Sequence, residues 1–233
     1  MVSIDTVYQR VLAAVNKENR GYITPQEFNL FANQAQLEIF EQYFFDLNQY
    51  SRLKENNTEY ANLYKITDEK LSIFKTEANL TYSTNYFQLP SNFHKLGTVI
   101  YNSITEVEKI DNKQLLDYLG SKLTQPSTSN PLYIQNTANS SNVLGIKVYP
   151  LTITSLISCS YVRKPNSVEW AYTNVAGDAL YNASNSTNFE LHNTEEVSLV
   201  YKILLYAGLN VKEADIVQIA DGKETKKITQ EKS

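Results

Sequence analysis

The segment from about Thr24 to Tyr50 constrains the fold most, because it has the apolar spacing of a helix on two faces. One row of apolar residues occupies positions 28, 31, 35 and 39, and another occupies positions 37, 40, 44 and 47. Two apolar faces on one helix indicate burial on two sides. The second face is therefore expected to contact either the rest of the same chain or a neighbouring subunit.

The residues that precede this helix, NKENRGYITPQE at positions 16–27, can also be read as a calcium loop. With Asn16 at position 1 of an EF-hand, Gly21 falls at position 6 and Glu27 at position 12, where the loop needs them. However, Asn16 is neutral and Arg20 would face the ion, so calcium is expected to bind weakly at most. A calcium-binding helical module that uses this degenerate loop is the alternative function.

A helix start explains more of the same residues. Thr24 is an N-cap residue, and Pro25 occupies the first helical position, where its missing N–H is not needed. Glu27 can bond back to the Thr24 N–H, and Ile23 and Phe28 have the spacing of a hydrophobic staple. We therefore predict that Thr24 and Glu27 cap this helix.

The rest of the chain alternates between helical and strand patterns. Helices are expected over 4–15, around 58–65, over 111–120, and from a cap at Asn193 with Glu196 to a stop at Gly208, with a second cap at Asn210. Period-two patterns predict strands over 74–90, 95–103, 131–137, 144–150 and 154–165, and composition predicts an exposed loop over 170–188.

These elements predict an α+β fold, a helical bundle formed by N- and C-terminal helices with a central antiparallel β region. The expected divisions are a bundle from residues 1–75 and 189–220, a β-rich region over 76–188 with a short helix and a long loop, and a C-terminal tail over 221–233. The length of 233 residues suits one large domain or two small ones.

Composition excludes several classes of protein. The net charge of -4 gives no sign of a nucleic-acid-binding surface, and no apolar run approaches the ~20 residues that cross a bilayer. The N-terminus lacks the order of a signal peptide. The single cysteine, Cys159, lies in a strand pattern and is interpreted as a small core residue.

No local pattern indicates catalysis. The chain has no phosphate-binding glycine loop and no nucleophile elbow. His94 and His192 lie near element boundaries, and no carboxylate spacing supports a shared metal, so both are read as surface or junction residues. We expect a protein that is not an enzyme and has no cofactor or metal; an enzyme whose carboxylates come from distant segments stays open as a third reading.

Three motifs occur in an order that resembles a known family. They are Phe87-Gln88-Leu89-Pro90-Ser91-Asn92-Phe93; Ile146 to Pro150 followed by Tyr161 to Pro165; and Phe189-Glu190-Leu191 with Glu195 and Glu196. This order resembles the head-to-tail adaptor proteins of short-tailed phages, the tail tubular protein A-like family. The segment RGYITPQEFNLFANQAQLEIFE is also similar to ring or connector proteins of crAss-like and marine phages.

The resemblance implies a structural virion protein of the phage neck, made in the cytoplasm of the host bacterium. Such a protein forms a homo-oligomer, a twelve-membered ring, between the portal protein and the tail. Genomic DNA passes through its lumen without sequence-specific binding, which the acidic balance of this chain fits, because a lumen that attracted phosphates would impede passage. The helix with two apolar faces would contact its own bundle on one side and the next subunit on the other.

The C-terminal tail, DGKETKKITQEKS at 221–233, has two readings. It has one large apolar residue, Ile228, and polar termini of this kind are usually disordered. In the adaptor family the C-terminal segment docks on the portal. The resemblance therefore implies that residues 221–233 gain structure on the portal protein, where Lys223, Lys226 and Lys227 meet acidic groups and Ile228 belongs to the same binding segment.

Overall fold

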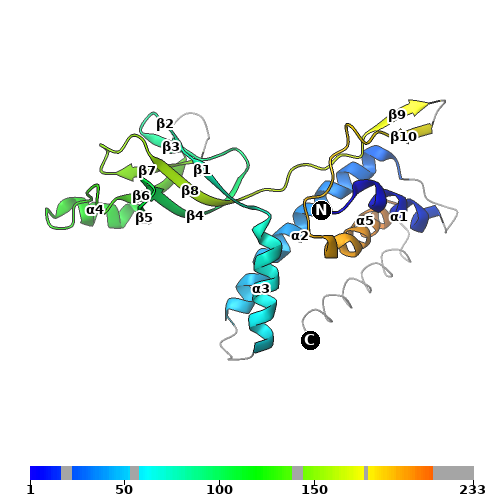
Figure 1. The fold of residues 1–233 in the computed structure, drawn as a ribbon, viewed down its shortest axis with the longest axis horizontal. Coiled ribbons are helices and arrows are strands. Elements are labelled where there is room, and N and C mark those ends of the chain that lie inside the picture. Colours follow the sequence, from blue (N-terminus) through cyan, green and yellow to red (C-terminus); the bar gives the residue numbers. More distant parts are fainter. Residues whose placement is uncertain (17–22, 53–57, 138–143, 176–177, 212–233) are drawn as a thin grey trace. The chain divides into compact units, whose positions relative to one another are not determined.

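The structure is a computed structural model that describes residues 1–16, 23–52, 58–137, 144–175 and 178–211. The chain divides into two compact units (Figure 1). Unit 1 comprises residues 1–73 and the chain from residue 165 onward, and unit 2 comprises residues 74–164. Unit 2 is therefore an insertion in the sequence of unit 1.

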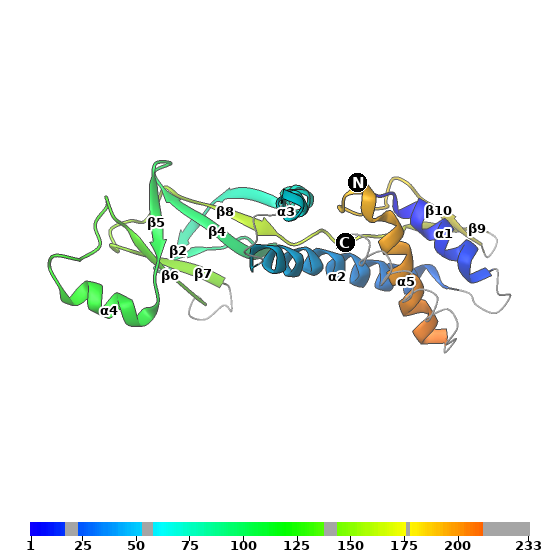
Figure 2. The same ribbon diagram turned by 90° about the horizontal axis from the view of Figure 1, so that it is seen from below.

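Unit 1 is mainly helical. Its elements are α1 (Ile4–Asn16), α2 (Pro25–Arg52), α3 (Thr58–Ser72), β9 (Tyr172–Val175), β10 (Asp178–Tyr181), the 3-10 helix η1 (Asn193–Glu195) and α5 (Glu196–Val211). The α5 helix packs against both α1 and α2, and α3 packs against α2 (Figures 1 and 2). The inner face of α2 is fully buried through its apolar residues Phe28, Ala32, Ala35, Ile39, Phe40 and Tyr43.

Three side-chain amides on α2 hold an extended segment of the chain, residues 166–170, against the helix. Asn29 bonds both the N–H and the carbonyl of Trp170, and Asn33 does the same for Val168. Gln36 donates to the carbonyl of Asn166 and accepts the N–H of Glu190. The spacing of four and then three residues puts the amides in one row on the helix. They replace the neighbouring strand that would otherwise satisfy this buried backbone.

The indole of Trp170 lies at the end of this segment and is fully buried. Its Nε1 donates to Asp5 of α1 at 3.0 Å, and its ring packs on Tyr8 at a centroid distance of 4.1 Å. Tyr172 of β9 and Tyr181 of β10 stack on the same indole. Residues 170–188 thus contain a β-hairpin anchored on a buried tryptophan, so the prediction of a loop is wrong for β9 and β10, whereas most described residues of the segment are exposed as predicted.

Unit 2 contains an eight-stranded sheet and one helix. Its elements are β1 (Lys75–Asn79), β2 (Thr81–Ser83), β3 (Tyr86–Gln88), β4 (Phe93–Tyr101), β5 (Thr105–Lys109), α4 (Asn112–Gly120), β6 (Leu132–Thr137), β7 (Leu144–Tyr149) and β8 (Ile157–Arg163). The strand order is β1-β8-β4-β5-β6-β7-β3-β2. The two edge strands, β1 and β2, are separated in sequence only by Leu80, so the sheet curls until it is nearly closed.

The curled sheet encloses its own hydrophobic core. Phe87, Val99 and Ile146 from three different strands are almost fully buried in it, together with Cys159 of β8. A second, smaller cluster of Ile110, Leu115, Leu132 and Ile134 packs α4 against β6. The helix α4 connects β5 to β6, and this crossover makes the β5–β6 pair parallel while the other pairs of the described sheet are antiparallel.

The predicted fold class, a helical bundle with a central antiparallel β region, is wrong. The described residues form a mixed α/β fold with five α-helices and a large, nearly closed sheet of eight strands. The physical reason is that period-two patterns locate single strands but do not say which strands pair. Here β1 pairs with β8, with Lys75 opposite Val162, and the sheet becomes a unit with its own core.

Three predicted helix limits also differ from the structure. The residue that caps the C-terminal helical segment is His192, whose side chain accepts the Thr194 N–H, and not Asn193. The helix α5 continues through Gly208 to Val211, because the packing of Ile203 and Ala207 outweighs the roughly 1 kcal/mol by which one glycine disfavours a helix. The short helix expected at 58–65 extends to Ser72 as α3.

Candidate functional site

The start of α2 has the capping geometry expected for Thr24 and Glu27. Thr24 Oγ1 accepts the Glu27 N–H at 3.2 Å, and the Glu27 carboxylate accepts the Thr24 N–H at 3.0 Å. The carboxylate also accepts the Thr24 hydroxyl at 2.9 Å. The hydrogen bonds from the backbone and then the side chain of Thr24 lower the pKa of Glu27 below its ordinary value of 4.5.

The same carboxylate is the group that an EF-hand would need as its bidentate ligand at position 12. In the structure it is bonded to Thr24 instead. Gly21 and Arg20 of the calcium reading lie outside the described residues. Among the residues that the structure describes, no three His, Cys, Asp or Glu side chains group in a way that could hold a metal ion.

The other residues singled out in the sequence lie in separate places. Cys159 is buried in the core of unit 2, and burial raises the pKa of its thiol to about 11. His94 lies on β4 in unit 2, whereas His192 belongs to unit 1. Lys223, Lys226, Lys227 and Ile228 lie outside the described residues, so the expected portal-binding group is not part of the described structure.

The outer face of α2 exposes large hydrophobic residues. Leu30 is 71% exposed, Leu37 is 44% exposed and Phe45 is 60% exposed. At 100° per residue these side chains lie on the side of the helix opposite the buried row of Phe28, Ala32 and Ile39. The first predicted row, at positions 28, 31, 35 and 39, is largely buried within unit 1. Of the second predicted row, Phe40 is also buried and only Leu37 is exposed, so the exposed apolar residues of α2 are a different set from the predicted second face. We call Leu30, Leu37 and Phe45 the α2 outer stripe.

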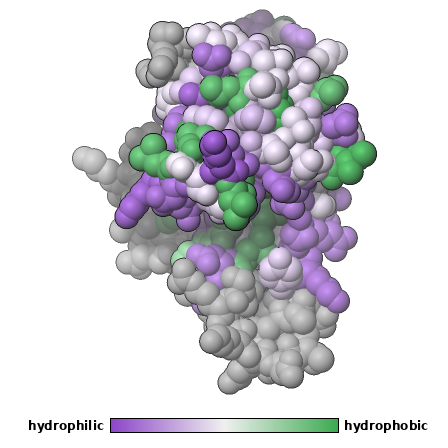
Figure 3. All heavy atoms as spheres, turned by 90° about the vertical axis from the view of Figure 1, so that its left-hand side faces the viewer, coloured by the Kyte–Doolittle hydropathy of each residue, from purple (hydrophilic) through white to green (hydrophobic). Residues whose placement is uncertain are grey.

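Unit 2 exposes hydrophobic residues as well. Figure 3 shows several green apolar groups between polar ones on the side of the molecule where α4 lies. On α4 and just after it, Leu116, Leu119 and Leu123 are exposed, whereas Leu115 is buried against β6. The helix thus uses one side to attach to the sheet and leaves an apolar row on another.

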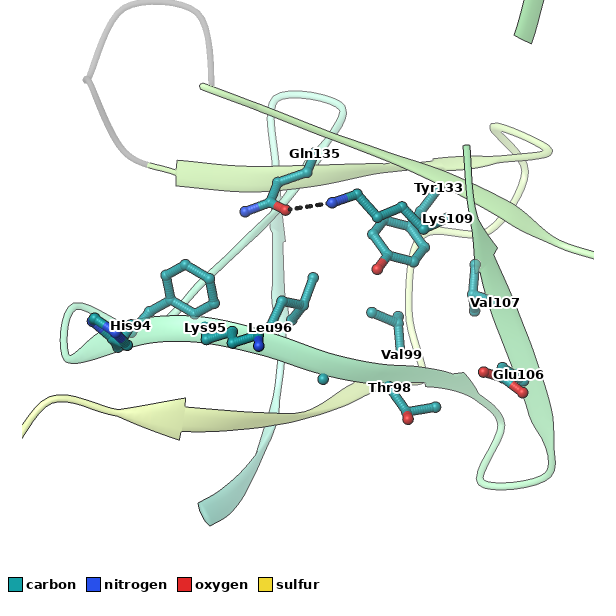
Figure 4. A pocket seen from close by; sticks show the side chains of 12 residues that line it. His94, Lys95, Leu96, Thr98, Val99, Glu106, Val107, Lys109, Tyr133 and Gln135 are labelled. Atoms are coloured by element: carbon teal, nitrogen blue, oxygen red, sulfur yellow. Dashed lines mark hydrogen bonds between the residues drawn. The ribbon is translucent and has the colours of Figure 1, made fainter. Parts of the chain in front are cut away.

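Unit 2 also has an open pocket of about 470 Å³ on its sheet (Figure 4). The pocket lies between the first half of β4 and the adjacent parts of β5 and β6. It is closed at one end by the pairing of Val99 with Val107, beyond which β5 leaves β4 and pairs with β6 at Glu108 and Lys109. The separation of the two strands creates the space.

The polar groups of the pocket come from all three strands. Lys109 of β5 donates to Gln135 Oε1 of β6 at 3.4 Å, while His94 and Lys95 line the opposite side on β4 (Figure 4). Tyr133 is only 4% exposed, and its hydroxyl points into the space (Figure 4). Burial, and to a smaller extent the charges of Cys159 and Glu106, raise the pKa of Tyr133.

Sequence reasoning missed this pocket entirely. Its residues belong to strands whose contributions begin at Phe93, Glu106 and Tyr133, and no two of these segments form a local motif. The only available signal was Lys109 beside the short helix, and it is indistinguishable in sequence from a solvated surface lysine.

No protein-family model matches the chain, and no curated protein matches it either. Among the described residues, no helix combines the length and apolar character that a membrane span requires.

Proposed function

We propose that this chain is a structural ring protein of a phage neck, which joins the portal to the tail and forms part of the DNA conduit. Support comes from the order of the three adaptor-like motifs in the sequence. Several motif residues, including Phe87, Leu89, Ile146 and Tyr161, are buried in the core of unit 2. The motifs that carry the resemblance therefore include core residues, which are the positions that related folds are expected to share.

The observation that carries the proposal is the α2 outer stripe. Exposed leucine and phenylalanine side chains in one row on a long helix are typical of a surface that another protein covers. In a ring each subunit uses two different surfaces, one for each neighbour, and the contacts must close. The α2 outer stripe is one such surface, and the homo-oligomer that the resemblance implies, a ring of twelve, would bury it.

The electrostatics of the chain are compatible with a conduit for DNA. Its net charge is -4, so a ring of these chains would not hold phosphates by the release of counterions. DNA is expected to pass without sequence-specific contacts. The chain is expected to be a component of the virion and to need no cofactor or catalytic group.

Assembly is tested by electron microscopy of the purified protein, alone and mixed with portal-bearing capsids. We expect closed rings in at least the second sample. The variants Leu30→Glu and Leu37→Glu should abolish the rings without changing the circular dichroism spectrum, because each puts a carboxylate into an apolar contact. Leu151→Glu, a change of an exposed leucine in unit 2, is the matched control and should leave assembly intact.

Persistence of rings in both α2 variants would refute the assignment of the α2 outer stripe to the subunit contact. A protein that stays monomeric in both samples would refute ring assembly itself.

The C-terminal tail has a separate test. We propose that residues 221–233 attach the ring to the portal through Lys223, Lys226 and Lys227, with Ile228 as the apolar contact. A chain that ends at Ala220 should keep its melting temperature and lose attachment to portal-bearing capsids. If the shortened chain attached normally, the proposal that the tail binds the portal would be refuted.

A further inference from the structure

The pocket in unit 2 lies beside β4, which among the described strands has a neighbour on its second side over only part of its length. The strand β4 pairs with β8 from Phe93 to Tyr101, with irregularities between Phe93 and Lys95 and between Leu96 and Val99. Among the described strands, β5 covers its other side only from Val99 to Tyr101. Since backbone amides along a strand point alternately to the two sides, part of the backbone between Phe93 and Thr98 faces the pocket without a neighbouring strand.

The far wall of the pocket has polar groups suited to an extended chain. The Tyr133 side chain is 4% exposed, and its hydroxyl points into the space of the pocket (Figure 4). A carbonyl or carboxylate of a ligand in this space can accept a hydrogen bond from the hydroxyl. The side-chain carbonyl of Gln135 and the amine of Lys109 lie next to it on the same wall (Figure 4).

The charges favour an anionic group at the open end. Lys95 and Lys109 line the two sides of the pocket, and the hydrogen bond of Lys109 goes to the neutral Gln135. The single carboxylate of the lining, Glu106, lies on β5 next to Val107, which closes the inner end. A carboxylate placed at the open end between the two lysines would meet two positive charges and stay away from Glu106.

We propose that this pocket binds an extended, acidic peptide segment of a partner protein, which adds as a strand along the free side of β4. The backbone of the segment bonds to β4, and one of its carboxylates lies between Lys95 and Lys109. The Tyr133 hydroxyl donates to a carbonyl or carboxylate of the segment. Strand addition of this kind derives affinity from the main chain and specificity from alternate side chains. The site is independent of ring assembly through the α2 outer stripe.

Binding is tested with the full chain and the fluorescent peptide acetyl-Val-Glu-Val-Glu-Val-amide, measured by fluorescence anisotropy. Saturable binding with a Kd of about 1 mM or tighter is expected. Two control peptides separate the contributions: acetyl-Val-Lys-Val-Lys-Val-amide reverses the charge, and acetyl-Val-Glu-Pro-Glu-Val-amide keeps the charge but removes a backbone donor. Both should bind at least about 5-fold more weakly, since each loses one interaction of roughly 1 kcal/mol.

Variants of the chain locate the binding. Lys109→Ala and Lys95→Ala should each weaken the binding of the acidic peptide by a similar factor. Tyr133→Phe should also weaken this binding, although the variant retains the aromatic ring that packs in the core. Lys113→Ala removes an exposed lysine of α4 and is the matched control, which should bind as the parent chain does.

Three outcomes would overturn the proposal. The first is no saturable binding of the acidic peptide. The second is equal binding of the acidic and proline-containing peptides, since strand pairing would then be absent. The third is full competition by succinate at the same concentration as the peptide, which would identify a site for small carboxylates instead of a peptide.

Discussion

The side-chain amide of Asn33 forms two hydrogen bonds with the backbone of Val168, a residue 135 positions away in the sequence. Its Nδ2 donates to the carbonyl oxygen at 2.8 Å, and its Oδ1 accepts the N–H at 2.9 Å. This is the pairing that a neighbouring β-strand would supply, made here by one side chain of a helix. It ties the two halves of unit 1 together across the insertion of unit 2.

Asn33→Asp is expected to destabilise the protein, because the new carboxylate keeps the acceptor but places a second oxygen against the Val168 carbonyl. Asn33→Ala leaves both backbone groups of Val168 without a partner. Each change should lower the free energy of unfolding by roughly 1–3 kcal/mol, measured by urea denaturation. Gln34→Ala, which removes an exposed amide from the same helix, is the control and should change stability little. Asn33 variants as stable as that control would contradict the role of the amide row.

Thr24→Ala is expected to lower stability by roughly 0.5–2 kcal/mol, because it removes the oxygen that accepts the Glu27 N–H. The measurement is thermal unfolding in calcium-free buffer, which keeps any metal out of the comparison. An unchanged melting temperature would count against the cap.

Glu27 should give the same cap a pH dependence. Its pKa is lower in the folded chain than the ordinary 4.5, so its stabilisation is present above pH 4.5 and is lost as the pH falls through the folded pKa. Glu27→Gln keeps a hydrogen-bonding side chain that does not ionise. The melting-temperature advantage of the parent chain over Glu27→Gln should therefore shrink as the pH falls below 4.5. A melting-temperature difference between the two chains that stays constant or grows in acid would contradict the predicted pH dependence.

Gly97→Ala should destabilise unit 2. A Cβ at Gly97 would lie 2.8 Å from Ser160 Oγ and 3.0 Å from the Ser160 carbonyl oxygen, both too close. The expected loss is roughly 1–3 kcal/mol in urea denaturation. Ser160→Ala removes the nearer atom, so the double variant should lose less than the sum of the two single variants. Strict additivity would show that the two positions do not collide.

Cys159 should resist alkylation in the folded protein. Its thiol is buried and has a pKa of about 11, so very little reactive thiolate exists at about pH 8. Mass spectrometry after iodoacetamide treatment should detect the modified thiol only in concentrated urea. Rapid modification without urea would contradict the core position.

Local patterns in the sequence predict what depends on neighbouring residues. The start of α2 follows from the Thr24, Pro25 and Glu27 spacing, and the strands β6, β7 and β8 follow from their alternation. The strand β5, TEVEK, was missed because only Val107 in it is buried, so its sequence resembles a polar loop.

Contacts between distant segments account for the rest. The row of Asn29, Asn33 and Gln36 is visible in the sequence, but amides on a helix are usually solvated. Their partners, residues 166–170 and Glu190, are distant in the sequence. The pocket likewise depends on where β5 leaves β4, which is decided by the parallel pairing of β5 with β6 across α4. The sequence around Lys95 and Tyr133 contains no local pattern that predicts this separation of β5 from β4.

The pairing of β1 with β8 brings together the two points where the chain enters and leaves unit 2. The Arg163 N–H bonds to the Phe74 carbonyl at 2.9 Å, and the Arg163 guanidinium lies over the Phe74 ring. If residues 75–162 were deleted, a short linker would therefore be enough to join Phe74 to Arg163. The β unit is therefore an insertion whose two ends lie side by side, so a gain, loss or exchange of the whole unit requires no rearrangement of the helical segments that flank it.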